Sequence, residues 1–194
     1  MNASNDLRMT VLAALFAALI AVGAFIAIPI GPVPIVMQNF FVLLCGLLLG
    51  PRWGLAACGV YLLAGALGLP VFAGGTGGLG RIFGPTGGYL LSYLPAVFLC
   101  GWISQNKKTP IVWDAIAMII ASMVIYGLGV SWLKVSTGMD WPKAVTVGML
   151  PFLLGDLLKI IAAVAVARAA RPIIGHYTGA PRPGHLQNGE HLSP

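Results

Sequence analysis

The sequence MTVLAALFAALIAVGAFIAI, residues 9–28, runs without a charged side chain. A helix that spans a bilayer requires about 20 predominantly apolar residues. This stretch therefore predicts a transmembrane helix. A cleavable signal peptide has a shorter apolar core, about 7–15 residues, and ends at a cleavage site of small residues. We therefore expect the segment to be retained in the protein.

Five more apolar stretches follow this one along the chain. Hydrophobic residues make up 58% of the sequence and charged residues only 8%, whereas soluble domains carry about 25% charged residues. This composition excludes a soluble globular domain and a disordered chain, and the three cysteines do not form the even set of a disulfide scaffold. The sequence predicts an all-α integral membrane protein with six transmembrane helices. The other five predicted helices cover residues 33–50, 53–69, 87–103, 111–133 and 146–170.

The basic residues predict the orientation in the membrane, because cytoplasmic loops carry an excess of lysine and arginine. They are scattered singly between apolar runs, which argues against a nucleic-acid interface. With both termini in the cytoplasm, the outer side carries fewer basic residues than the inner side. We therefore expect a six-helix membrane domain over residues 1–174 and a flexible cytoplasmic tail over residues 175–194. The inner set is Arg8, Arg52, Lys107, Lys108, Arg168, Arg171 and Arg182, and the outer set is Arg81, Lys134 and Lys143.

The connection between the third and fourth predicted helices is rich in glycine: PVFAGGTGGLGRIFGPTGGY, residues 70–89. It lacks the strand, helix and downstream carboxylate that a dinucleotide site needs. Non-helical backbone at membrane depth is tolerated where it is buried in protein or lines a cavity. The loop is therefore either an extracytoplasmic lid over a pocket or a tight re-entrant turn. Arg81 either clamps a ligand carboxylate or reaches a lipid headgroup.

Asp156 and Lys159 are two charged residues that lie well inside the last apolar stretch. Their spacing of three residues places them on one helix face, and their position predicts a site roughly 15–20 Å inside the helix. They form either a polar floor for a ligand or a structural ion pair. Gln38 and Asn39 in the second stretch are interpreted in the same two ways, as a ligand contact or as an interhelical hydrogen bond.

Small residues follow one side of the first predicted helix. Ala14, Ala17, Ala18 and Ala21 repeat at helical spacing, which allows another helix to approach closely. This face either docks a partner protein or packs internally. The sequence contains no catalytic constellation and no metal-binding motif, so we expect neither an enzyme nor a metal site.

Three motifs together resemble the BioY family, the biotin-binding S components of energy-coupling factor (ECF) transporters. They are Pro70-x-Phe72-x-Gly74-Gly75-x-x-Gly78, the run from Gly84 to Tyr89, and Asp156-x-x-Lys159. The resemblance extends over all six apolar stretches. It implies that six helices in the cytoplasmic membrane of a prokaryote enclose biotin near the outer side. It also implies that the alanine-rich first helix docks on a membrane coupling subunit, and that two ABC-type ATPases use ATP to drive uptake.

The resemblance and the residue chemistry together suggest the ligand-binding set. Biotin has a ureido ring, an apolar thioether ring, an aliphatic chain and a carboxylate, so its pocket should be mostly apolar with a few polar groups. No cofactor is expected. The alternatives are an S component for another vitamin, such as riboflavin or thiamin, and a membrane enzyme or scaffold. The expected substrate-binding residues are Gln38, Phe72, Gly74, Gly75, Gly78, Arg81, Tyr89, Asp156 and Lys159.

Overall fold

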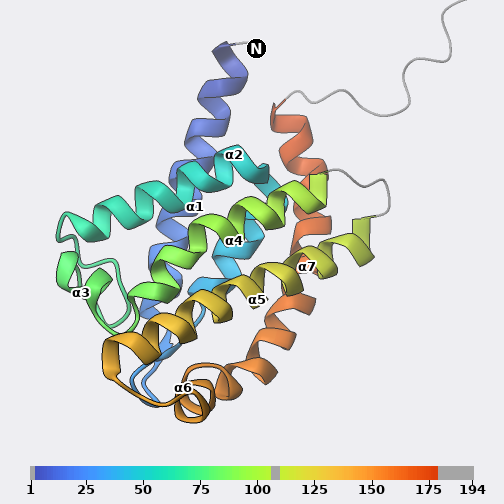
Figure 1. Cartoon of the computed structure of the whole chain (residues 1–194). Helices are drawn as coiled ribbons and strands as arrows, with labels where there is room; N and C mark the ends of the chain where they lie inside the picture. Colours follow the sequence, from blue (N-terminus) through green and yellow to red (C-terminus); the bar gives the residue numbers. More distant parts are fainter. Residues whose placement is uncertain (1–2, 106–109, 179–194) are drawn as a thin grey trace, which may run out of the picture.

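The computed structural model describes residues 3–105 and 110–178 and is almost entirely helical (Figure 1). A two-residue antiparallel pair, β1 (Ala27–Ile28) with β2 (Ile35–Val36), joins the first two helices. A short 3-10 helix, η1 (Leu150–Phe152), precedes the last helix. The α-helices are α1 (Ala3–Phe25), α2 (Gln38–Ala66), α3 (Leu79–Phe83), α4 (Gly87–Gln105), α5 (Pro110–Thr137), α6 (Trp141–Gly148) and α7 (Leu153–Thr178).

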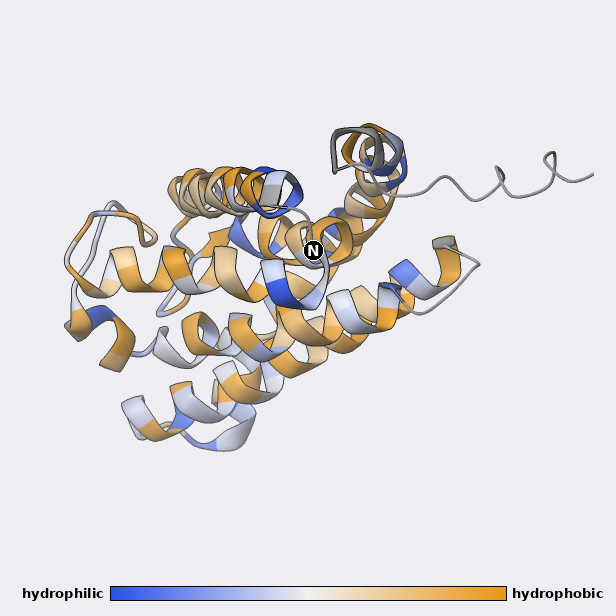
Figure 2. Ribbon diagram, turned by 90° about the horizontal axis from the view of Figure 1, so that it is seen from above, coloured by the Kyte–Doolittle hydropathy of each residue, from blue (hydrophilic) through white to orange (hydrophobic). Residues whose placement is uncertain are grey.

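Five helical stretches in the described part of the chain are long and apolar enough to cross a membrane. They are α1, α2, α4, α5 and the region from Trp141 to Gly175, which includes α6 and most of α7. Figure 2 shows hydrophobic residues along each of the long helices, on the outward-facing side as well as on the inward-facing side. A helix that is apolar all round is typical of a membrane bundle. The predicted class, an all-α membrane protein, is confirmed.

The second and third predicted helices are the two limbs of α2, which is broken at Gly50. This glycine has φ +75° and ψ −175°, a conformation that residues with a β-carbon disfavour. A β-carbon built on Gly54 would lie 3.6 Å from the Cα of Gly46, whereas eight residues of straight helix span about 12 Å. The chain therefore turns back on itself at Gly50–Pro51, and α2 supplies two of about six helical limbs.

The last predicted helix begins later than expected. The chain forms α6 and η1 before α7 starts at Leu153, so residues 146–152 are not part of the long helix. Pro151 interrupts the ladder of backbone hydrogen bonds. Asp156 therefore lies in the first turn of α7, and the predicted position 15–20 Å inside a helix is wrong. At its other end α7 continues to Thr178, past the predicted boundary at residue 174, and residues 179–194 lie outside the described part.

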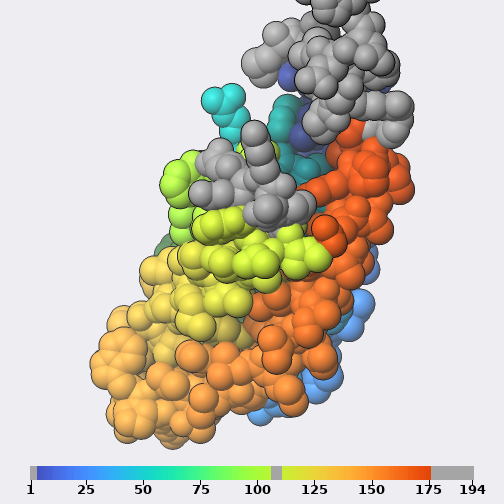
Figure 3. Space-filling model, turned by 90° about the vertical axis from the view of Figure 1, so that its right-hand side faces the viewer, coloured from blue at the N-terminus to red at the C-terminus, as the bar shows by residue number. Residues whose placement is uncertain are grey.

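The helices pack around α2 and α4. α4 lies between α2 and α5, α1 covers α2, and α7 contacts both α2 and α5. Figure 1 shows α3 and α6 at one end of the bundle, and the start of α1 with the end of α7 at the other. Figure 3 shows α7 along an outer face of the molecule, beside α5. The largest fully buried side chains include Tyr61, Phe72, Ile20, Met118 and Leu133.

Candidate functional site: two adjoining cavities

A mostly apolar cavity lies near the α3 end of the bundle. The space between its walls is about 370 Å³, with the open solvent at its mouth included. Three segments from two separate parts of the sequence form its wall. These are the β1–β2 hairpin with the start of α2, the loop between α2 and α4, and the first two turns of α4. The lining residues are Val33, Pro34, Val36, Gln38, Phe72, Ala73, Arg81, Thr86, Tyr89, Leu90 and Tyr93.

Four of the predicted binding residues line this first cavity: Gln38, Phe72, Arg81 and Tyr89. Gln38 is buried, and its Nε2 atom donates a hydrogen bond of 2.7 Å to the Tyr61 hydroxyl. The ring of Phe72 packs edge-on against that of Tyr61, with centroids 5.6 Å apart. The wall of the cavity is therefore held in place by contacts behind it.

Arg81 brings the only positive charge to the lining of the first cavity. Its Nη2 atom donates to the Ala73 carbonyl oxygen at 3.2 Å, and no carboxylate pairs with it among the residues that the structure describes. A half-buried guanidinium without a carboxylate partner is suited to bind an anionic group of a ligand.

The remaining loop residues of the predicted set, Gly74, Gly75 and Gly78, are not among the residues that line either cavity. All three have positive φ, at +77°, +67° and +92°. The turn at Gly74 and Gly75 brings Phe72 and Thr76 together in an isolated β-bridge. In this structure the glycines shape the loop, and neighbouring side chains of the loop line the cavity.

A second cavity contains the predicted charged pair. It lies between α2, α5 and α7, and the space between its walls is about 180 Å³, open solvent included. Lys159 Nζ lies 2.9 Å from Asp156 Oδ1, so the predicted pairing at a spacing of three residues is confirmed. Asp156 also lies in the first turn of α7, where the helix dipole favours a negative charge. The lining residues are Asn39, Phe40, Leu43, Met118, Ser122, Asp156, Lys159 and Ile160.

Partners from other helices complete the charged pair, and the sequence analysis missed them. The Tyr126 hydroxyl on α5 donates to Asp156 Oδ2, and Lys159 Nζ donates to the Val36 carbonyl oxygen at 2.8 Å. Both carboxylate oxygens are therefore hydrogen-bonded, and one N–H of the lysine ammonium is left for a further acceptor. A tyrosine in an apolar stretch carries no signal that identifies its partner, so this contact could be found only from the structure.

The two cavities adjoin each other through polar contacts. The Tyr93 hydroxyl, from the first cavity, donates to Asn39 Oδ1, from the second, at 2.7 Å. Val36 lines the first cavity and accepts the hydrogen bond from Lys159 in the second. The first cavity is therefore apolar and has Arg81 at one side. The Asp156–Lys159 pair lies in the second cavity, and the hydrogen bond between Tyr93 and Asn39 separates the two.

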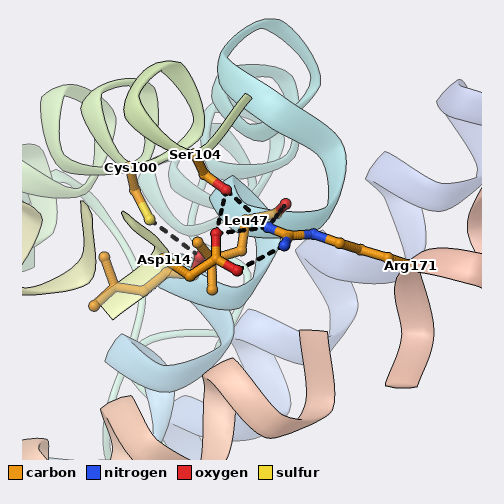
Figure 4. A network of polar contacts seen from close by, with 6 residues as sticks. Leu47, Cys100, Ser104, Asp114 and Arg171 are labelled. Carbon is orange, nitrogen blue, oxygen red and sulfur yellow. Dashed lines mark hydrogen bonds and ion pairs between the residues drawn. The ribbon is translucent and has the colours of Figure 1, made fainter. Parts of the chain in front are cut away.

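A second ion pair lies at the other end of the bundle (Figure 4). Arg171 Nη1 lies 2.6 Å from Asp114 Oδ2, and Arg171 Nη2 donates to Asp114 Oδ1, to Ser104 Oγ and to the Leu47 carbonyl oxygen. Leu47 precedes Pro51 by four residues, and proline has no N–H with which to complete the helix. Arg171 therefore supplies the donor that the break in α2 removes.

The predicted docking face on α1 is divided by the fold. Ala14 and Ala18 are exposed, together with larger apolar residues of the same helix. Ala17 is buried in the core and Ala21 is half-buried, because the helical period turns these positions toward the bundle. Ala17 thus contributes to internal packing, and an outer face built on all four alanines is wrong.

No group of three or more potential metal ligands occurs in the described ranges, 3–105 and 110–178. The polar groups of the two cavities are suited to bind an organic molecule. A mostly apolar chamber with a few placed hydrogen-bonding and charged groups is typical of sites for small amphipathic ligands.

Comparisons with known proteins agree with this geometry. The family described as the BioY family matches residues 1–176. The chain is 42% identical over 161 residues to the "Biotin transporter BioY" of Thermotoga maritima, which covers 83% of this chain and 94% of that protein. It is 43% identical over 156 residues to the "Probable biotin transporter BioY" of Pyrococcus horikoshii, covering 80% of this chain and 91% of that protein.

A solved structure has the same fold. It is described as the crystal structure at 2.1 Å of the S-component for biotin from an ECF-type ABC transporter. The TM-score is 0.81 at 30% sequence identity, and the match covers 89% of this chain and 95% of the solved one.

Proposed function

The chain belongs to the BioY family, and from this premise we propose that it binds biotin as the S component of an ECF-type transporter. The family is one of transporters rather than enzymes. The observation that carries the proposal for this chain is the first cavity. It is mostly apolar and contains Arg81, which has no carboxylate partner in the described part of the chain.

The chemistry of biotin suggests how it occupies the site. Its carboxylate would pair with Arg81, because a guanidinium binds a carboxylate with two parallel hydrogen bonds. Its thioether ring and aliphatic chain would lie against Phe72 and Tyr89. Its ureido group would be directed toward Asp156 and Lys159, which can accept from N–H groups and donate to an oxygen. The hydrogen bond between Tyr93 and Asn39 would then open, so that one ligand occupies both cavities.

The test is equilibrium binding of radiolabelled biotin to the protein purified in detergent. We expect saturable binding of one biotin per chain, and competition by unlabelled biotin but not by riboflavin or thiamin. Binding of either of those vitamins in place of biotin would identify an S component of different specificity. The absence of saturable binding of all three would contradict the proposal.

We also propose that the glycine-rich loop and α6 lie on the outer side of the cytoplasmic membrane, with both termini inside. The distribution of basic residues supports this orientation. Cys45, Cys58 and Cys100 are buried, so labelling by a thiol reagent reports on a cysteine that is introduced at an exposed position. In intact cells, a membrane-impermeant thiol reagent is expected to label Lys143→Cys on α6 and to leave Ser4→Cys unlabelled. If the reagent labels Ser4→Cys and not Lys143→Cys, the orientation in the membrane is opposite to the one proposed.

The partners that we propose are a membrane coupling subunit and two ABC-type ATPases, with the exposed side of α1 as the docking face. Ala14 and Ala18 are the small residues on that side, and small residues allow a second helix to pack closely in a membrane. Ala18→Trp is expected to reduce co-purification with the coupling subunit several-fold and to leave biotin binding unchanged.

The matched control for this docking prediction is Ala162→Trp, because Ala162 is also exposed but lies on α7. It should co-purify with the coupling subunit as the parent protein does. Equal losses in the two variants would show that α1 is not the docking helix.

A further inference from the structure

Tyr89 connects the first cavity with a helix that does not line it. The side chain lines the cavity and is buried. Its hydroxyl donates a hydrogen bond of 2.8 Å to the carbonyl oxygen of Gly148, the last residue of α6. No residue of α6 belongs to the lining of the first cavity, so Tyr89 is a bridge between the cavity and a helix at the periphery.

Two glycines make room for the Tyr89 side chain. A β-carbon on Gly129 of α5 would lie 2.3 Å from Tyr89 Cδ1, and one on Gly148 would lie 2.4 Å from the Tyr89 hydroxyl oxygen. Non-bonded carbon atoms pack at about 3.5–4.0 Å. Any residue larger than glycine at either position must therefore displace the tyrosine, which is part of the wall of the cavity.

We propose that Gly129 and Gly148 are positioning residues for the ligand, because they leave the space that Tyr89 occupies at the wall of the cavity. Tyr89 in turn connects α6 to the bound molecule. This inference rests on the proposed binding of biotin. The Tyr89 hydroxyl donates its hydrogen bond to the Gly148 carbonyl oxygen, so the side chain presents its ring, and not a hydrogen-bond donor, to the ligand. It therefore faces the thioether ring or the aliphatic chain of biotin rather than a polar group.

The structure provides a matched control two residues away on the same helix. Gly127 is exposed, and a β-carbon there meets nothing within 4 Å. Gly127→Ala and Gly129→Ala make the same change in the same helix, and differ in whether they displace Tyr89. We expect the biotin Kd of Gly127→Ala to stay within twofold of the parent value, and that of Gly129→Ala to rise at least fivefold. Both variants should elute as monodisperse proteins in detergent.

A second measurement separates positioning from a general loss of stability. Biotin is expected to slow backbone hydrogen exchange over residues 141–148 in the parent protein and in Gly127→Ala, because the ligand fixes Tyr89 and Tyr89 fixes the end of α6. Tyr89→Phe keeps the ring and removes the hydroxyl, so its exchange in this region should not respond to biotin. This variant also decides the question if Gly129→Ala does not fold.

The outcomes distinguish this inference from the proposed function. If the parent protein binds biotin and Gly129→Ala binds it equally well, the position of the Tyr89 side chain does not affect ligand binding and the inference is overturned. It is also overturned if biotin protects residues 141–148 in Tyr89→Phe as it does in the parent. If the parent protein does not bind biotin, the proposed function fails and the inference fails with it.

Discussion

Lys159→Met is expected to weaken biotin binding by more than tenfold. The Lys159 ammonium group holds Asp156 at 2.9 Å and the Val36 carbonyl oxygen at 2.8 Å, and it keeps one N–H for the ligand. A hydrogen bond to a charged group contributes about 1.5–3 kcal/mol, and about 1.4 kcal/mol corresponds to tenfold in Kd. The variant also leaves the buried Asp156 carboxylate with only its Tyr126 partner. The measurement is the Kd for radiolabelled biotin in detergent.

Lys143→Met is the control for this prediction, because it removes a lysine that is exposed on α6. Its biotin Kd should remain within twofold of the parent value. The double variant Asp156→Leu with Lys159→Met distinguishes a ligand contact from a structural pair. Apolar replacement of both partners of a buried ion pair is often tolerated by the fold, so we expect folded protein that does not bind biotin. Tight binding by this variant would end the claim that the pair contacts the ligand.

The Asp156–Lys159 pair shows what could be predicted from the sequence. Two charged residues three positions apart in an apolar stretch share a helix face, and this local rule is sufficient to predict their contact. The same reasoning failed for their depth, because it did not recognise that α6 and η1 precede the long helix. Their partners Tyr126 and Val36 come from α5 and β2, and no local rule relates those segments to α7.

The cavity illustrates the same division between local and non-local structure. The glycine-rich stretch predicted an irregular loop, and Phe72 and Arg81 from this loop do line the cavity. The expectation that the glycines themselves would reach a ligand depended on how the loop turns. Gly74, Gly75 and Gly78 have positive φ, and the side chains that line the cavity are those of Phe72, Ala73 and Arg81 on either side of them. This placement is a property of the folded loop and not of its composition.

The ion pair between Arg171 and Asp114 is a specific contact that a general rule about charge distribution does not predict. The positive-inside rule assigned Arg171 to the inner side as one of several equivalent charges. In the fold it pairs with Asp114, whose side chain is 1% exposed, and caps the Leu47 carbonyl oxygen at the break in α2. The charge is therefore part of the packing of four helices (Figure 4).

Arg171→Met is expected to lower the free energy of unfolding by about 3 kcal/mol. Removal of one partner of a buried ion pair costs about 3–5 kcal/mol, and the lower end applies because the Arg171 side chain is 30% exposed. The variant leaves Asp114 with Ser104 alone and leaves the Leu47 carbonyl oxygen without that donor. For a chain of this size, about 3 kcal/mol corresponds to a decrease of roughly 6–12 °C in Tm. Thermal unfolding in detergent measures this decrease.

Arg168→Met is the matched control, because Arg168 is exposed on the same helix three residues earlier and forms no ion pair with any described residue. Its Tm should change by less than about 2 °C, as surface substitutions usually cost within about 0.5 kcal/mol.

The double variant Asp114→Leu with Arg171→Met should recover much of the lost stability, because it removes the unpaired carboxylate. Recovery should be incomplete, since the Leu47 carbonyl oxygen still lacks the donor that Pro51 cannot provide. An equal loss of Tm in Arg168→Met and Arg171→Met would mean that α7 needs positive charge at this end rather than the specific contact with Asp114.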